Sequence, residues 1–395
     1  MPALLGVGLL GYGGVARAHL NGVRRHAEAF PDAPATARVV VLAGRHPVRV
    51  AVAARRFRIP RWTTDWRSLI DDPAVDVLIN AAPNDAHAAP CIAALGAGKA
   101  VLCEKPLART APEAATMARA AQGRGRVAMA GFNYRFVPAV LLARRLIAER
   151  RLGRIYHFRG RYSDDSLLDP TMGFGWRHDR TAAGSGVIGD LASHVIDLAH
   201  FLIGPIAGVT ASVRTYVGTR RAGRTPRQVT VEDAVVATLE FENGAVGTLE
   251  ASGMCPGRKN LLTFEVNGEG GTLAFDLERL NELRVFHGDG RARGLADVLV
   301  TGPGHPYGDR WWPAGHILGW EHTFIHQFEE FVRRAAGTGG DRVGATFADG
   351  LAAARVCDAL LVAAETGRRT AVVPRATKRP HRATRRPAKP HVRKG

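Results

Sequence analysis

Cysteine is scarce in this chain, and its few copies lie far apart. The 395 residues include only four cysteines, at positions 91, 103, 255 and 357, and no two of them form a C-x-x-C pair. This spacing argues against a zinc ribbon, a thioredoxin-like redox site and a disulfide framework. We therefore predict buried, unreactive thiols and no metal site.

A long hydrophobic run is also missing. No stretch approaches the roughly 18 consecutive apolar residues of a membrane span. Residues 1–10 are apolar, but they have no basic leader and are more typical of a first strand than of a targeting segment. Hydrophobic residues at 46% and charged residues at 23% are ordinary for a soluble globular protein. The sequence thus predicts a cytoplasmic protein with no membrane partner.

Acidic residues are absent from the end of the chain. Residues 375–395 contain nine Lys or Arg, three Pro and no Asp or Glu, and so carry half of the formal charge of +18. Because such a composition cannot bury a core, we predict a disordered basic tail at residues 374–395. The tail is suited to nonspecific attraction of polyanions, or is solvated without a specific function. We expect no specific nucleic-acid partner, because the body of the chain is only mildly basic.

Apolar strand-like runs alternate with helix-like stretches through the first 135 residues. The runs cover residues 4–10, 39–43, 75–81, 100–103 and 126–131. Nearly continuous apolar strands between helices predict a parallel sheet that is covered on both faces. The expected fold class is therefore α/β, with a doubly wound domain at residues 1–135.

Residues 136–373 have longer strands with alternating polarity, which is typical of an antiparallel sheet. Within them, Asn243-Gly244 suits the turn of a hairpin, and a helical stretch at 346–366 closes the fold. We predict a second, α+β domain for substrate binding and oligomerisation, with a large open, mostly antiparallel sheet. Because an open sheet needs a cover, we expect a homodimer or homotetramer formed through it.

A glycine-rich turn follows the first strand and opens a helix. It runs Gly11, Tyr12, Gly13, Gly14, Val15, Ala16. In this context the first glycine makes a tight turn, the next lets the backbone approach a pyrophosphate, and the helix N-terminus supplies N–H donors. An overlapping pattern that starts at Gly6 leaves almost no strand before it. We therefore predict a Rossmann dinucleotide site at Gly11 to Val15.

The second strand lacks the carboxylate that usually binds the adenosine ribose of NAD. Gly44 and Arg45 follow it instead. A missing carboxylate removes the repulsion that excludes a 2′-phosphate, and an arginine offers a planar donor fork for one. This favours NADP over NAD. The alternative is that Arg45 stacks on adenine or faces solvent, with NAD as the cofactor.

The candidate chemistry lies at Lys105, Asp190 and His194. Glu104-Lys105-Pro106 follows an apolar strand, and the carboxyl end of a parallel strand is where open α/β sheets bind ligands. Asp190 and His194 are four residues apart in a helical stretch and so face the same way. A histidine exchanges protons near neutral pH, and hydride transfer from an alcohol needs such a base. Alone, an Asp/His pair at this spacing is more often structural.

Together with further motifs, these residues resemble the Gfo/Idh/MocA oxidoreductases over residues 4–370. The motifs include Gly11-x-Gly13, Ala82-Pro83-Asn84-x-x-His87, Glu104-Lys105-Pro106, Gly131-Phe-Asn-Tyr-Arg135, Trp176-Arg177, Asp190-x-x-x-His194 and Val231-Glu-Asp233. The resemblance implies a Rossmann domain, an open antiparallel sheet that forms oligomers, and NAD(P)-dependent oxidation or reduction of sugars and cyclitols.

The resemblance also implies roles for single residues. The catalytic trio is Lys105, Asp190 and His194. The cofactor-side residues that it implies beyond the glycine turn are Pro83, Asn84, His87 and Glu104. We add Lys105 and, from the end of the second strand, Gly44 and Arg45. The substrate-side residues are Tyr134, Arg135, Trp176, Arg177, Asp190 and His194. The glycine that usually stands two residues after the aspartate is Ala192 here, a small change that leaves the trio intact.

An aromatic and histidine-rich segment at residues 305–324 narrows the resemblance towards the anhydrosugar and inositol dehydrogenases of the family. Aromatic planes beside histidines suit a ring that carries several hydroxyls. We place His316 and His322 on the substrate side, whereas Trp311 and Trp320 fit a substrate site and a subunit interface equally.

The predicted function is therefore an NAD(P)-dependent oxidoreductase that transfers hydride between the nicotinamide and a cyclic polyol or sugar. The alternative from another class is a dinucleotide-binding sugar sensor or transcriptional regulator of the same fold. An intact trio argues against it, because a sensor has no need for all three groups. A hydrolase that uses NAD transiently fits the motifs poorly.

Overall fold

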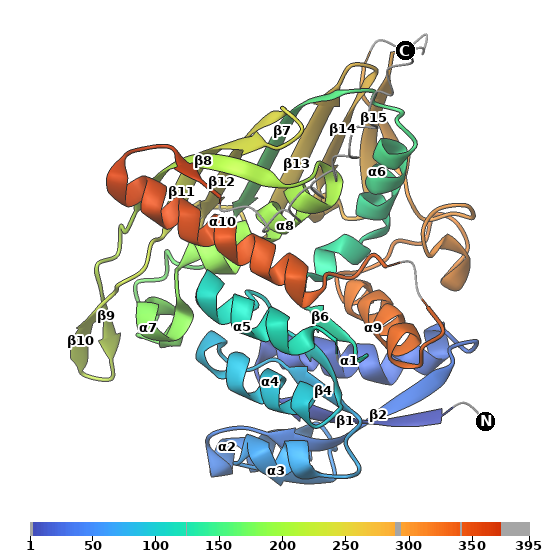
Figure 1. Ribbon diagram of the computed structural model, residues 1–395, viewed down its shortest axis with the longest axis vertical. Coiled ribbons are helices and arrows are strands. Elements are labelled where there is room, and N and C mark those ends of the chain that lie inside the picture. Colours follow the sequence, from blue (N-terminus) through green and yellow to red (C-terminus); the bar gives the residue numbers. More distant parts are fainter. Residues whose placement is uncertain (1–2, 124, 289–293, 340–341, 373–395) are drawn as a thin grey trace, which may run out of the picture.

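The computed structural model describes residues 3–123, 125–288, 294–339 and 342–372, and shows two large sheets joined into one body (Figure 1). The first sheet has six strands, all parallel, in the order β3-β2-β1-β4-β5-β6. Its strands are β1 (Ala3–Leu10), β2 (Ala35–Ala43), β3 (Arg61–Thr63), β4 (Val77–Asn80), β5 (Ala100–Cys103) and β6 (Ala128–Ala130). The predicted doubly wound α/β domain is confirmed.

Helices cover both faces of this sheet, which explains why its strands are apolar throughout. They are α1 (Gly14–Ala29), α2 (Pro47–Arg56), α3 (Trp66–Asp71), α4 (Ala88–Gly96) and α5 (Ala111–Ala121). Val7 and Leu9 pack with α1 in one core, whereas Leu78 packs with α4 and α5 in another. Burial of apolar side chains on two faces stabilises each strand by the hydrophobic effect.

The second sheet has nine strands in the order β16-β15-β14-β13-β7-β12-β11-β8-β17. Every neighbouring pair is antiparallel except β7 with β12. The strands are β7 (Ile155–Ser163), β8 (Ile206–Arg214), β11 (Ala234–Phe241), β12 (Val246–Ser252), β13 (Leu261–Gly268), β14 (Gly271–Asp276), β15 (Glu282–His287), β16 (Ala296–Leu299) and β17 (Thr370–Ala371). The expected open, mostly antiparallel sheet is therefore confirmed, including the turn at Gly244, whose φ is +86°.

Helices lie on one face of the large sheet. They are α6 (Pro138–Ala148), α8 (Ser193–Leu202) and α10 (Phe347–Thr366). Within the described part of the chain the other face is uncovered and carries Arg159, Glu250 and Glu265 with the exposed Val236. A small hairpin of β9 (Thr219–Ala222) and β10 (Thr225–Gln228) extends from the body beside α7 (Arg180–Ala183) (Figure 1).

The chain returns to the first sheet near its end. Helix α9 (His322–Ala335) packs along α1, where a Cβ at Gly22 would meet the Phe324 carbonyl oxygen at 3.0 Å. Helix α10 packs against α5. The later part of the chain therefore helps to cover the first sheet, and a domain boundary at residue 135 stays a prediction. The predicted tail at 374–395 lies outside the described residues.

Two further findings concern features that the sequence lacked. Cys91, Cys103 and Cys357 are buried, but Cys255 is partly exposed, so the prediction of four buried thiols was wrong for that one. Cys255 lies in the connection after β12, where the next four residues, 256–259, are exposed. None of the described helices is long and apolar enough to cross a membrane.

Candidate active site

The glycine turn has the geometry of a phosphate-binding loop. Gly11 has a φ of +105°, and a Cβ there would meet the Ala81 carbonyl oxygen at 2.4 Å, so no other residue fits. A Cβ at Gly13 would meet nothing within 4 Å, which leaves room for a ligand. Across the turn, a Cβ at Gly44 would meet the Tyr12 ring at 2.2 Å. Gly44 therefore lets Tyr12 pack at the end of β2.

The first turn of α1 is suited to an anion. It begins at Gly14 and Val15, has no side-chain cap and contains no acidic residue. Its first N–H groups and the positive end of the helix dipole are thus available to a pyrophosphate. Arg45 follows β2, with its side chain 65% exposed and one guanidinium nitrogen 3.9 Å from an Asp85 carboxylate oxygen.

The loop after β4 is tied to neighbouring segments. Asn84 donates a hydrogen bond of 2.8 Å to the Ala183 carbonyl, which links the loop to α7. The His87 ring lies 3.0 Å from the carbonyl oxygens of both Pro106 and Ala82. Burial lowers the pKa of His87. His87 therefore braces the turn that follows Lys105, and Pro83 precedes the short 3-10 turn η1 (Asn84–Ala86) in the same loop.

Glu104 connects the phosphate-binding helix to the end of β5. One of its carboxylate oxygens lies 2.6 Å from His19 Nε2 on α1, and the other accepts a hydrogen bond of 3.1 Å from the Lys105 N–H. A Cβ at Gly131 would come within 2.8 Å of the same carboxylate. The sequence reasoning missed His19. Its signal is a histidine on the buried side of the helix that the glycine turn opens.

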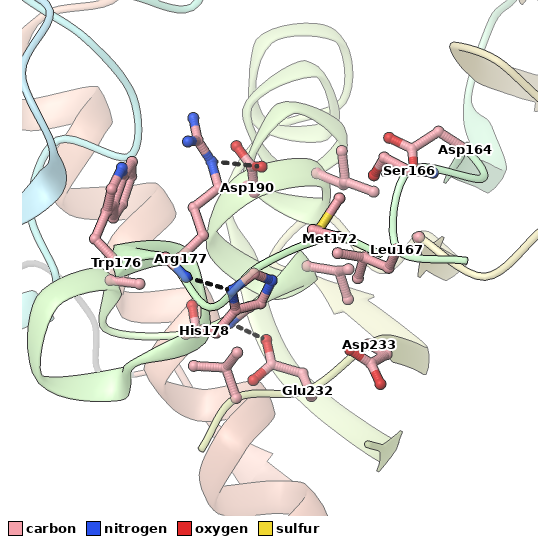
Figure 2. Close-up of a pocket in the computed structure, with 18 of the residues that line it drawn as sticks. Asp164, Ser166, Leu167, Met172, Trp176, Arg177, His178, Asp190, Glu232 and Asp233 are labelled. Atoms are coloured by element: carbon pink, nitrogen blue, oxygen red, sulfur yellow. Dashed lines mark hydrogen bonds and ion pairs between the residues drawn. The ribbon is translucent and has the colours of Figure 1, made fainter. Parts of the chain in front are cut away.

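Lys105 is held by Asp190, a contact that the sequence reasoning did not predict. The ammonium of Lys105 donates hydrogen bonds to the Asp190 carboxylate at 2.8 Å and to the Asp190 carbonyl at 2.7 Å. Arg177 lies 3.4 Å from the other carboxylate oxygen (Figure 2). Burial by itself would raise the pKa of Asp190, but Lys105 and Arg177 outweigh it and hold that pKa well below its usual range. The peptide bond between Lys105 and Pro106 is cis.

Asp190 occupies a π-helical turn, η4 (Ile188–Ala192), that continues into α8. Such turns insert an extra residue into a helix and are frequent at functional sites. The turn places Asp190 beside Lys105, while His194 lies at the start of the regular helix. Both residues face the end of β5.

His194 is enclosed by aromatic rings. The centroids of Tyr134, Tyr162 and Phe132 lie 4.5, 5.8 and 5.9 Å from the centroid of its imidazole. Burial, and then the cation of Lys105, lower the pKa of His194 well below its ordinary value. The imidazole is therefore neutral at neutral pH and can accept a proton. Tyr134 also lies 3.0 Å from Tyr162, hydroxyl to hydroxyl.

A cavity of about 450 Å³ opens beside Asp190. Its polar lining residues are Asn84, Asp164, Ser166, Trp176, Arg177, His178, Ser185, Asp190, Glu232 and Asp233. Figure 2 shows Arg177 and Asp190 pointing towards one another, with His178 and Glu232 on another part of the wall. The cavity thus joins the predicted Trp176, Arg177 and Asp190. It also contains Asp164, His178 and Glu232, which sequence reasoning did not assign to the site.

Five predicted substrate residues do not line this cavity. Tyr134 and His194 pack against one another, and the other three are Arg135, His316 and His322. Arg135 is 5% exposed and forms a two-point ion pair with Asp197, with N–O distances of 2.7 and 2.8 Å. His316 is exposed, with its Nδ1 2.9 Å from the Pro313 carbonyl oxygen, and His322 packs on the Trp311 ring. None of these three residues lines the cavity. The position of Arg135 therefore gives no support to its predicted substrate contact, because Asp197 occupies its guanidinium.

The comparisons with known proteins agree with this geometry. Residues 5–132 match the model of the oxidoreductase family with an NAD-binding Rossmann fold, and residues 140–274 match that of the GFO/IDH/MocA C-terminal domain. The chain belongs to the Gfo/Idh/MocA family of oxidoreductases. Its first domain is accordingly an NAD-binding domain.

Levoglucosan dehydrogenase of Pseudarthrobacter phenanthrenivorans is 41% identical over 376 residues, which cover 91% of this chain and 96% of that protein. A solved structure of levoglucosan dehydrogenase with NADH and levoglucosan has a TM-score of 0.89 at 41% identity, and covers 93% of this chain and 99% of that one. D-xylose dehydrogenase of Paenarthrobacter nicotinovorans is 27% identical and covers 74% of this chain and 76% of that protein. The chain is thus similar to sugar dehydrogenases over nearly its whole length.

Proposed function

We propose that this protein is a dehydrogenase of a neutral cyclic sugar, with an anhydrosugar of the levoglucosan kind as the favoured substrate. The observation that carries the proposal is the Lys105–Asp190 pair at the end of β5, with a neutral His194 beside it. The similarity to levoglucosan dehydrogenase over 91% of the chain supports the anhydrosugar.

Lys105, Asp190 and His194 have separate roles in the proposed reaction. NAD(P), when bound, supplies the nicotinamide that accepts the hydride. Lys105 then polarises the substrate hydroxyl through its ammonium, and Asp190 keeps that ammonium in place with two hydrogen bonds. His194 accepts the hydroxyl proton, because its low pKa leaves it neutral. In the reverse direction the protonated histidine returns that proton to the carbonyl oxygen.

The charge of the cavity favours a substrate without an anionic group. Four residues contribute carboxyl groups to its wall, against the single guanidinium of Arg177 among the described lining residues: Asp164, Asp190, Glu232 and Asp233. A phosphate or a uronate would face net repulsion in a partly desolvated site. We therefore do not propose a sugar phosphate as the substrate, although one relative is named glucose-6-phosphate 3-dehydrogenase. That protein, of Bacillus subtilis, is 32% identical over 58% of this chain.

The test is the absorbance of NAD(P)H with levoglucosan, myo-inositol, xylose, glucose and glucose 6-phosphate as substrates. We expect the highest kcat/KM with levoglucosan, and a value at least tenfold lower with glucose 6-phosphate than with glucose. Preference for the phosphate ester would contradict the charge argument. NADH and sugar binding without any turnover would instead favour the sugar sensor.

Within NAD(P), we propose that NADPH binds at least as tightly as NADH. The support is the cation of Arg45 beside Gly44, where no carboxylate follows β2. Asp85 lies close to Arg45 and partly offsets that charge. We expect Arg45→Ala to weaken NADPH binding about tenfold, as for the loss of one charged hydrogen bond, and NADH binding less than twofold. Fluorescence titration with both dinucleotides measures this, and equal losses for the two would contradict the role of Arg45.

We also propose that the open face of the large sheet forms a homodimer or homotetramer. Its support is the exposed Val236 and Val246 among paired charges on a face that no described helix covers. Sedimentation analysis of the wild type and of Val236→Asp is the test. We expect the variant to dissociate, and a wild-type monomer would contradict the proposal.

A further inference from the structure

The segment that leads to Asp190 is attached to one buried residue, Glu232. A Glu232 carboxylate oxygen accepts hydrogen bonds from the N–H of Gly186 at 2.8 Å and of Ile188 at 3.0 Å. Between them, the N–H of Val187 donates to the Glu232 carbonyl at 3.1 Å. Three successive N–H groups, those of residues 186–188, therefore donate to the single residue Glu232.

The close approach of the two segments requires glycine at position 186. A Cβ at Gly186 would lie 2.0 Å from the Glu232 carbonyl oxygen. The Gly186 carbonyl in turn accepts a hydrogen bond of 3.0 Å from the N–H of Asp190. The contact therefore continues from Glu232 through Gly186 to the backbone of Asp190, whose carbonyl and carboxylate hold Lys105.

The burial of Glu232 costs stability, which is unexpected if the residue only caps the backbone. It is 2% exposed, and its second carboxylate oxygen has no hydrogen-bond partner among the described residues. Burial raises its pKa. Unsatisfied buried polar groups cost stability and are uncommon away from sites where they serve a function. Glu232 also lines the cavity together with Gly186 and Asp190.

We propose that Glu232 is a positioning residue, whose carboxylate fixes the start of the helix that carries Asp190 and thereby places the Lys105 ammonium for the reaction. The role of Lys105 in that reaction rests on the proposed function. Glu232 acts through the backbone of residues 186–190. An acceptor oxygen at this position is what the geometry requires.

The test compares Glu232→Ala and Glu232→Gln with Glu330→Ala. Glu330 is a matched control because it is 5% exposed and also accepts two backbone hydrogen bonds, of 3.1 and 2.9 Å, from Val343 and Gly344. We expect kcat to fall at least tenfold in Glu232→Ala, since small misplacements of reacting groups are costly. Glu232→Gln keeps the acceptor, so its kcat stays within threefold of the wild type. The Kd of NADH changes less than twofold in both.

A second readout needs no turnover. The rate of acetylation of Lys105 by acetic anhydride, followed by mass spectrometry, reports how firmly its ammonium is held. Lys99 is the internal reference, because its ammonium also donates to backbone carbonyls, those of Asp72 and Val75. We expect Lys105 to react at least threefold faster relative to Lys99 in Glu232→Ala, and unchanged in Glu330→Ala and Glu232→Gln.

Unchanged Lys105 reactivity in a folded Glu232→Ala would overturn the proposal, as would equal losses of kcat in Glu232→Ala and Glu330→Ala. If Glu232→Ala does not fold, Glu232→Asp takes its place in the test. The shorter aspartate side chain cannot reach the N–H groups of both Gly186 and Ile188. Wild-type reactivity of Lys105 in that variant would overturn the proposal too. A wild type without turnover would defeat the proposed function, while the acetylation comparison would still stand.

Discussion

Two ion pairs have their aspartates on one helical segment, and the pKa values of these aspartates shift in opposite directions. Asp190 pairs with Lys105 and Asp197 pairs with Arg135, each at 2.7–2.8 Å. The side chain of Asp190 is 44% exposed at the cavity, whereas that of Asp197 is 2% exposed in the core. The pKa of Asp190 is lowered, but burial raises that of Asp197 to about 6 despite its arginine.

The difference shows that the surroundings of an ion pair, more than its two residues, decide the pKa of its carboxyl group. Lys105 and a second cation, Arg177, hold the pKa of Asp190 low against the effect of burial. An adjoining cavity puts Asp190 within reach of a ligand. Asp197 has lost its water, so its charged form is costly even beside a cation. The first pair is therefore suited to binding and chemistry, and the second to holding the helix in place.

The largest expected effect on turnover comes from breaking the Lys105–Asp190 pair, which adjoins the cavity. Lys105→Ala removes the ammonium that we propose polarises the hydroxyl, and we expect kcat to fall about 10³- to 10⁴-fold, near the upper end for acid–base and electrostatic groups. The melting temperature stays close to that of the wild type, because the pair adjoins solvent. Steady-state kinetics and calorimetry measure both, with Lys99→Ala as the control for removal of a lysine. An undiminished kcat would refute the assigned role.

Breaking the buried Arg135–Asp197 pair should lower stability and leave turnover nearly unchanged. Arg135→Ala leaves the Asp197 carboxyl buried without its partner, which costs about 3–5 kcal/mol in the free energy of unfolding. Urea denaturation measures this loss, and kcat of the fraction that remains folded changes little. If the variant lost turnover with full stability, Arg135 would be a substrate residue after all.

The pH dependence of turnover sharpens the comparison further. Below its lowered pKa, His194 becomes protonated and can no longer accept a proton, so kcat/KM falls only on the acid side, at a pH well below 6.5. Asp190 raises the pKa of His194 and Lys105 lowers it. Asp190→Asn therefore moves the acid limb to still lower pH. A limb that moved to higher pH would contradict this electrostatic assignment.

The sequence predicted much of the site because its motifs are local. Gly11 and Gly13 follow a strand and open a helix, and Lys105 ends another strand, so their places follow from the parallel sheet itself. The spacing of Asp190 and His194 indicates the pair only in combination with Lys105 and the family resemblance. The π-helical turn that places Asp190 was not visible, since no sequence rule distinguishes it from a regular helix.

Other residues needed contacts that lie far apart in the chain. Arg135 stands beside Tyr134 in a motif, but its side chain points to Asp197, 62 residues away. Glu232 reaches residues 186 and 188 across 46 and 44 positions, and His19 reaches Glu104 across 85. Such partners are set by how segments pack, which a motif does not encode.

The sequence by itself determined the two-sheet α/β architecture, the dinucleotide turn and the family, because hydrophobic periodicity, glycine geometry and local motifs act within short segments. The tertiary structure alone decided the different surroundings of the two aspartates on one helical segment. That outcome depends on solvent access, on a second cation and on the cavity wall, and these arise only when residues distant in the chain are brought together.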